Sequence, residues 1–233
     1  MAAWQSTSDG DGIFGVPLEA LSLRWPPLIN ELQELLLAHV GTADQLAAAL
    51  SKASHASVQQ LLDAVCSAID GAHGARGIGV ALTAVRDPGP SQVAAVSLGA
   101  LLRLLVRLPS PAVPCELYPL VLSSGSGAVA PLLRKRLPAD RAAFIDAIGS
   151  LFGRLLLRCS FDDGLTPATT EHESALHALL FVLTPALLRP APDVPMPLAE
   201  RTAATRAVRA LLCYHLQRER FRSLGGAPGA HGD

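Results

Sequence analysis

The segment EHESALH, residues 171–177, contains the residue types of a metal site. In the zinc-binding pattern H-E-x-x-H, two histidines lie on one face of a helix and bind the same ion. His172 and His177 are instead five residues apart. At about 100° per residue their directions differ by about 140°, so one helix cannot bring both rings to one ion. We therefore expect no metal site and no bound cofactor.

Other reactive residue types lack the context that their chemistry requires. The loop SSGSGAV, residues 123–129, has no following Lys-Ser/Thr and no preceding strand, so it is not a phosphate-binding loop. Cys66, Cys115, Cys159 and Cys213 lie far apart without a CxxC pair, which predicts buried free thiols. No nucleophile elbow or catalytic carboxylate pair is recognisable. We do not expect the chain to be an enzyme.

Composition excludes several classes of partner. The 233 residues carry 19 basic and 20 acidic side chains, so no overall field attracts nucleic acid or an anionic membrane. The longest apolar stretch, Val93 to Leu108, contains Arg103 and Arg107 and is shorter than the roughly 20 residues of a membrane span. The N-terminus, MAAWQSTSDGDG, lacks the apolar core of a secretory signal. We expect a cytoplasmic protein without a transmembrane segment.

The elements that must position any site are helices. Half of the residues are apolar, mainly Ala and Leu, which favours helix over strand. Apolar residues recur at helical spacing over about residues 27–38, 45–50, 58–70, 91–107, 116–122, 130–136, 138–155, 171–183 and 198–221. Ser91 is an expected N-cap, Thr170 and Glu173 have capping-box spacing, and Pro185 closes or kinks its helix. The last helix is rich in Arg on its expected exposed side.

These patterns predict an all-α protein. We expect one bundle of about eight helices over residues 12–222, between flexible tails at 1–11 and 223–233.

Three blocks of sequence together resemble one family. The first is GIFGVPLEAL, Gly12 to Leu21, followed by PPLINELQELL. The second is LLRLLVRLPSPAVPCELYPLVL, Leu101 to Leu122, and the third is HALLFVLTPALLRP, His177 to Pro190. In order and spacing they resemble Rho GTPase-activating (RhoGAP) domains. The resemblance covers about residues 12–222 and implies that family's helical bundle. The structural positions that it implies are Leu108, Pro109, Pro111, Pro114, Pro185 and Arg189.

The resemblance also implies a site, because RhoGAP domains place an arginine finger against the phosphoryl group that a small GTPase transfers. Such a finger is worth on the order of 10³–10⁵ in rate. The family's finger lies in a loop after the first long helix, but the matching segment, Val40 to Ser57, contains no Arg. The finger position falls between Ala48 and Lys52, so Lys52 is the only Lys or Arg available there.

Three further polar positions of the family are substituted. Its two basic positions near the Leu-Pro-x-Pro motif fall one residue before Arg103 and one residue before Arg107. Its Asn that positions the finger falls one residue after His177. A slip of one residue turns a helical side chain by about 100°, so these neighbours are not automatic substitutes. Candidate partner-binding residues are therefore Lys52, Arg103, Arg107 and His177.

Two functions are compatible with these residues. The resemblance predicts a domain that binds a Rho, Rac or Cdc42-type small GTPase and regulates its signalling in trans, with no identifiable finger to activate hydrolysis. The alternative is a helical protein-interaction or scaffold module that keeps only the bundle. The packing motifs fit both functions, whereas the missing polar residues favour the second.

Overall fold

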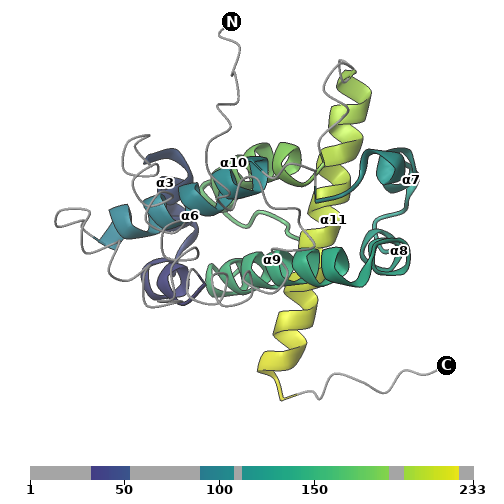
Figure 1. The fold of residues 1–233 in the computed structure, drawn as a ribbon. Coiled ribbons are helices and arrows are strands. Elements are labelled where there is room, and N and C mark those ends of the chain that lie inside the picture. Colours follow the sequence, from purple (N-terminus) through teal and green to yellow (C-terminus); the bar gives the residue numbers. More distant parts are fainter. Residues whose placement is uncertain (1–32, 53–89, 108–111, 189–196, 226–233) are drawn as a thin grey trace, which may run out of the picture.

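The computed structural model describes residues 33–52, 90–107, 112–188 and 197–225. Residues 33–39 are helical, and eight further helical elements follow: α3 (Ala43–Lys52), α6 (Pro90–Arg107), η1 (Cys115–Leu117), α7 (Tyr118–Ser123), α8 (Val129–Arg136), α9 (Ala139–Arg158), α10 (Thr170–Leu187) and α11 (Leu198–Ser223). The described part contains no strand, which confirms the all-α prediction (Figure 1). The expected helix at 58–70 and the tail at 1–11 lie outside the described residues.

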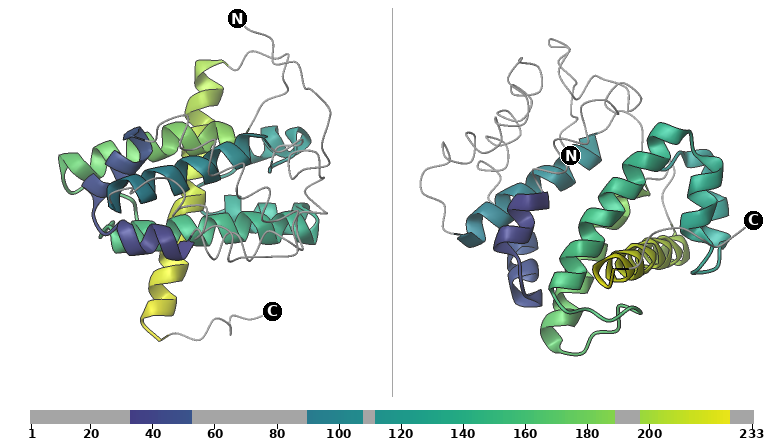
Figure 2. Two further views of the ribbon diagram at one scale, coloured as in Figure 1. Left: turned by 60° about the vertical axis from the view of Figure 1, so that its left-hand side comes forward. Right: turned by 90° about the horizontal axis from the view of Figure 1, so that it is seen from below.

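The helices are arranged around the steep crossing of α9 and α11, which share the most extensive contact in the described part. Helix α3 packs against both α6 and α10, and α10 also contacts α11. Helices α7 and α8 pack against α11 on the side away from α3 and α6 (Figure 2). The bundle therefore has an α3–α6–α10 layer and an α7–α8 layer, joined through α9 and α11.

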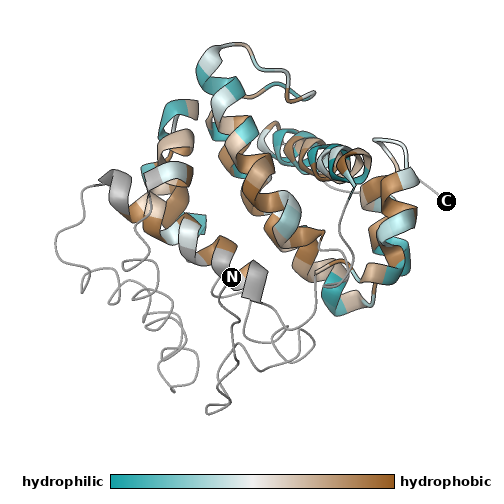
Figure 3. Cartoon of the chain, turned by 90° about the horizontal axis from the view of Figure 1, so that it is seen from above, coloured by the Kyte–Doolittle hydropathy of each residue, from teal (hydrophilic) through white to brown (hydrophobic). Residues whose placement is uncertain are grey.

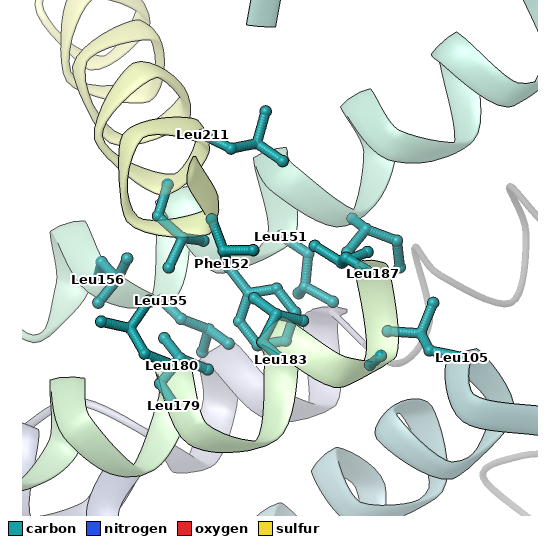
Figure 4. Close-up of a cluster of buried hydrophobic side chains, with 14 of the residues drawn as sticks. Leu105, Leu151, Phe152, Leu155, Leu156, Leu179, Leu180, Leu183, Leu187 and Leu211 are labelled. Carbon is teal, nitrogen blue, oxygen red and sulfur yellow. The ribbon is translucent and has the colours of Figure 1, made fainter. Parts of the chain in front are cut away.

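Apolar side chains from four helices fill the centre. Figure 4 shows the cluster, in which Leu105 comes from α6, Phe152 and Leu155 from α9, Leu183 from α10 and Leu211 from α11. Along α9 the buried residues recur at helical spacing, and Figure 3 shows this apolar line. Burial stabilises each large apolar side chain by roughly 1.5–3 kcal/mol, so this shared cluster holds the two layers together.

Two glycines bring α9 and α11 unusually close. A Cβ added at Gly149 would overlap the ring of His215, which is fully buried in α11. A Cβ at Gly153 would lie 2.9 Å from the backbone carbonyl carbon of His215. Because the glycines are one helical turn apart, they form a notch that receives His215. Any larger residue here would force the two helices apart.

The observed ends of α6 and α10 differ from the predicted ones. Helix α6 begins at Pro90, so Ser91 lies in its first turn instead of capping it. The cap of α10 is Thr169, whose side chain accepts a hydrogen bond from the backbone N–H of His172, so the prediction of Thr170 was wrong by one residue. Pro185 lies inside α10, which continues to Leu187. Proline removes one backbone donor there, but this close to the C-terminus the helix tolerates the loss.

Candidate functional site

The helices that carry the candidate partner-binding residues pack against one another. Lys52 is the last residue of α3, Arg103 and Arg107 lie in α6, and His177 lies in α10. Contacts of α3 with both other helices make this layer continuous. The side chains of Lys52, Arg103 and Arg107 are outside the described part, so their convergence on one surface stays a prediction. Only the side chain of His177 is described, and it is exposed.

The described part of the segment that matches the finger loop, residues 40–52, is helical from Ala43 onward. Residues 48–52 form the second half of α3, and Ala49 on this stretch is buried. The Ser51 hydroxyl donates to the backbone carbonyl of Ala48 at 3.2 Å, which satisfies the serine within the helix itself. At the other end, the Thr42 hydroxyl accepts from the backbone N–H of Gln45 at 3.2 Å and so caps α3. This backbone belongs to the packed layer and presents no arginine.

His177 belongs to an exposed face of α10. Ser174, His177, Phe181 and Pro185 recur at three- or four-residue spacing and are all exposed, while the opposite face packs inward. Phe181 is 75% exposed, which is unusual for a large aromatic residue. The α10 face, defined by these four residues, therefore combines a titratable ring with an apolar one. Phenylalanine is enriched at protein contact surfaces.

The ends of two motifs from the resemblance meet in space. The backbone N–H of Val113 donates to the carbonyl of Leu187 at 3.3 Å. Pro114 follows immediately, with φ −57°, and is the N-cap residue that precedes η1. Leu108, Pro109, Pro111 and Arg189 lie outside the described residues. The chain after α6 is thus tied to the end of α10, which fixes how these two helices meet.

A cluster of polar side chains between α8, α9 and α11 was not predicted. The Asp146 carboxylate accepts from Arg134 Nη2 at 2.6 Å and lies 3.4 Å from Arg218 Nη1. Arg134 Nη1 also donates to the Tyr214 hydroxyl at 2.7 Å, and the guanidinium lies 5.2 Å from that ring's centre. The hydrogen bond to Asp146 is the main reason why the pKa of Arg134 is raised. Asp146 of α9 therefore links α8 and α11 through these two arginines.

Glu219 is the centre of a second cluster, and its side chain is only 4% exposed. Its carboxylate accepts from the Ser150 hydroxyl at 2.6 Å, from Arg154 Nε at 3.0 Å and from Arg222 Nη1 at 2.7 Å. Burial alone would raise the pKa of Glu219. The hydrogen bonds from Ser150 and Arg154, with the charges of Arg154 and Arg222, outweigh burial and lower it. Glu219 is therefore ionised and bound on three sides, which indicates a structural role.

His215 lies between these clusters in the glycine notch. Neither ring nitrogen has a hydrogen-bond partner, and Nε2 lies 3.7 Å from the Asp146 carboxylate. Burial lowers the pKa of His215 to about 4, although the Asp146 charge opposes this shift. At neutral pH the ring is therefore uncharged. It fills space between α9 and α11 and is not accessible to a substrate.

His172 holds α10 to the end of α9. One ring nitrogen is 2.9 Å from the Thr169 hydroxyl and the other is 3.0 Å from the carbonyl of Cys159. The ring also meets Phe161 edge-on, with centroids 4.6 Å apart. His172 therefore faces inward while His177 faces solvent, as their spacing predicts. Cys159, beside this contact, is a buried free thiol, and burial raises its pKa to about 11.

The expectation that α11 exposes its arginines was wrong for most of them. Arg201 and Arg206 are exposed, whereas Arg209, Arg218, Arg220 and Arg222 are half-buried. Arg220 Nη2 donates to the carbonyl of Phe161 at 2.6 Å, and its Nε pairs with Asp163 at 3.1 Å. These bonds secure the loop after α9, which contains the left-handed residues Ser160 and Leu165. The half-buried arginines therefore stabilise the fold.

Comparisons with known proteins bear on the fold. No family model matches this chain, and no curated protein sequence matches it. Its structure is similar to the BH domain from GRAF, the GTPase regulator associated with focal adhesion kinase, with a TM-score of 0.53 and 12% sequence identity. The match covers 92% of this chain and 100% of that one. At this identity the similarity shows a shared helical fold. No helix in the described part is long and apolar enough to cross a membrane.

Proposed function

We propose that this chain is a RhoGAP-like regulatory domain that binds a Rho-family small GTPase without supplying an arginine finger. The observation that carries the proposal is the joint occurrence of two features. Three sequence blocks occur in the order and spacing of RhoGAP domains, and the fold resembles a domain from a protein described as a GTPase regulator.

The packing of the α3–α6–α10 layer supports the proposal. The segments that align with the family's finger, its basic helix and its positioning Asn lie on three helices that contact one another. The hydrogen bond between Val113 and Leu187 joins two of the three sequence blocks. Segments that are distant in the sequence therefore lie in one layer of the fold, which is necessary if they are to contact the same partner.

Binding without activation follows from the finger segment. Residues 48–52 carry one cation, Lys52, on a helix and no Arg. A lysine ammonium is a point charge and cannot bond phosphate oxygens in the bidentate manner of a guanidinium. Without a finger, the roughly 10³–10⁵-fold acceleration that one supplies is not expected. The domain would then sequester or localise its GTPase.

Binding and catalysis are tested separately with purified Rho, Rac and Cdc42-type GTPases. Calorimetry or biolayer interferometry with GDP-loaded and non-hydrolysable GTP-loaded forms measures affinity, and single-turnover assays measure hydrolysis. We expect binding to one GTP-loaded form and an unchanged hydrolysis rate. The Arg103→Ala/Arg107→Ala double variant should weaken that binding. Lys135→Ala, which removes an exposed cation from α8 on the far side of α11, is the matched control.

Two results would contradict the proposal. Absence of binding to every GTPase form by the folded protein would remove its basis. Acceleration of hydrolysis that disappears in Lys52→Ala would show that a lysine replaces the finger, and the domain would then be an activator.

A second candidate function is a protein-interaction module for another partner. The exposed α10 face favours it, because Phe181 at 75% exposure suits a protein contact that needs no nucleotide. If GTPases do not bind, proximity labelling of wild type and Phe181→Ser in cells distinguishes the two cases. Loss of a specific labelled protein in Phe181→Ser would support this second function, whereas identical labelling would exclude the α10 face.

A further inference from the structure

A cleft lies on the side of α11 that faces the loop between α7 and α8. Its volume is about 510 Å³, and its walls include Ser126 and Gly127 from that loop and Gly164 from the loop after α9. Arg206, Arg209 and Tyr214 of α11 also line it. A smaller hollow of about 270 Å³ shares Ser126 and Arg206 with it. The combined size matches sites that hold small molecules.

The lining carries positive charge and no carboxylate. Arg206 and Arg209 line the cleft, and neither Asp nor Glu does. The nearest acidic loop is engaged elsewhere, because Asp162 accepts from the backbone N–H of Thr166 at 2.6 Å and Asp163 pairs with Arg220 at 3.1 Å. An anion in the cleft would therefore meet two guanidinium groups without a competing carboxylate on its walls.

The two arginines differ in how they are held. Arg209 Nη2 donates to the carbonyls of Gly164 at 3.2 Å and Leu165 at 3.0 Å, which fixes that guanidinium at the cleft wall. Arg206 is exposed and has no hydrogen bond or ion pair with any described residue. Three residues apart on one helix, they lie on the same side. One guanidinium is thus fixed in advance, and the other is free to close on a ligand.

We propose that this cleft binds a small phosphate-bearing molecule. Arg206 and Arg209 bind the phosphate, for which the planar guanidinium fork is well matched, and the Ser126 hydroxyl donates to a further oxygen. The volume exceeds that of a phosphate ion, so Ala210 and Tyr214 contact the organic part of the ligand. The site lies on the α7–α8 side of α11 and does not involve the proposed GTPase surface.

The test uses the full chain and matched pairs of probes. Calorimetry compares glucose 6-phosphate with glucose, AMP with adenosine and O-phosphoserine with serine, beside inorganic phosphate alone. We expect at least one phosphorylated probe to bind while its unphosphorylated partner does not. Arg206→Ala should weaken that binding by about ten- to a hundredfold, the range for hydrogen bonds to charged groups. Arg206→Ala should leave the Tm of the unliganded protein unchanged, because that side chain has no described partner.

The control is Arg201→Ala on the same helix. Arg201 is also exposed but does not line the cleft, so its variant should keep wild-type affinity. Equal weakening by Arg201→Ala and Arg206→Ala would show non-specific attraction and overturn the site. So would the failure of every phosphorylated probe to bind at millimolar concentration. An oligoglutamate peptide that binds more tightly than every phosphorylated probe would assign the cleft to acidic protein segments instead.

Discussion

Substitution of Gly149 by Ala tests whether the glycine notch determines the α9–α11 packing. In an ordinary helix interior this change stabilises by up to about 1 kcal/mol, because Ala has the higher helix propensity. Here the new Cβ would overlap the ring of His215, whose side chain is fully buried. The two helix backbones are also close together here, since backbone atoms of His215 lie 2.9 Å from a Cβ position at Gly153. We therefore expect the sign of the effect to reverse.

The magnitude follows from two opposing terms. Overpacking in a filled core costs about 1–3 kcal/mol, and the full burial of the overlapped ring places this site at the upper end. Subtracting the helix propensity gain leaves a net loss of about 2 kcal/mol. For a chain of this length that loss lowers the Tm by about 4–8 °C. Gly127→Ala is the control, because nothing lies within 4 Å of its Cβ position and its stability should not fall.

Urea denaturation monitored by circular dichroism measures both variants. A double-mutant cycle with His215→Ala then identifies the cause, because removing the ring should abolish the penalty at Gly149. The reasoning is refuted if Gly149→Ala is as stable as wild type. It is also refuted if the same penalty persists in the His215→Ala background, since the clash would then not involve the ring.

Three further predictions concern the buried polar groups and the cap of α10. The pKa of His215 is about 4 in the folded state and about 6.5 in the unfolded state, so the folded state binds fewer protons between these values. The contribution of His215 to the free energy of unfolding is therefore fully present above pH 6.5 and is lost as the pH drops toward 4. Unfolding free energies at pH 7 and 5 should differ by about 2 kcal/mol, and equal values would contradict the buried neutral ring. Glu219→Gln should cost about 2 kcal/mol in urea denaturation at pH 7, because it removes the charge that binds two arginines; a cost below that of an exposed ion pair would contradict this. Thr169→Ala should cost about 1 kcal/mol, with a lower Tm, while Thr170→Ala should be near neutral; the reverse order would restore Thr170 as the cap.

Helix positions followed from local sequence, whereas helix ends did not. The apolar spacing that predicts α9 is a property of its own residues, and the structure buries that same face. The start of α10 depends on more than local spacing, because two adjacent threonines could each cap it. Thr169 is the cap in a structure where His172 also reaches the carbonyl of Cys159, a residue of the preceding turn. The spacing of residues in the sequence does not predict that tertiary contact.

The polar clusters could not be predicted because their members are far apart in the sequence. Ser150 and Glu219 are separated by 69 residues, and Asp146 and Arg218 by 72. One local signal was present, since Asp146, Ser150 and Arg154 recur every four residues within the mainly apolar middle of α9. Because polar side chains on a packed helix need hydrogen-bond partners, this spacing implies that a neighbouring helix supplies polar side chains of its own. The structure brings the three helices that carry the candidate partner-binding residues into contact, but the positions of the Lys52, Arg103 and Arg107 side chains stay a prediction.

The two kinds of arginine in α11 determine how binding data on this protein must be interpreted. Arg218 and Arg220 bond a carboxylate and a carbonyl of other elements, and Arg222 bonds the buried Glu219 of its own helix, so removing any of the three lowers stability as well as charge. If a variant at one of these three positions no longer binds a partner, the loss of binding can result from unfolding as well as from a lost contact. Arg206, exposed and without a described partner, separates the two effects. A binding loss at unchanged Tm therefore identifies a contact residue, and among these four arginines only Arg206 is expected to show it.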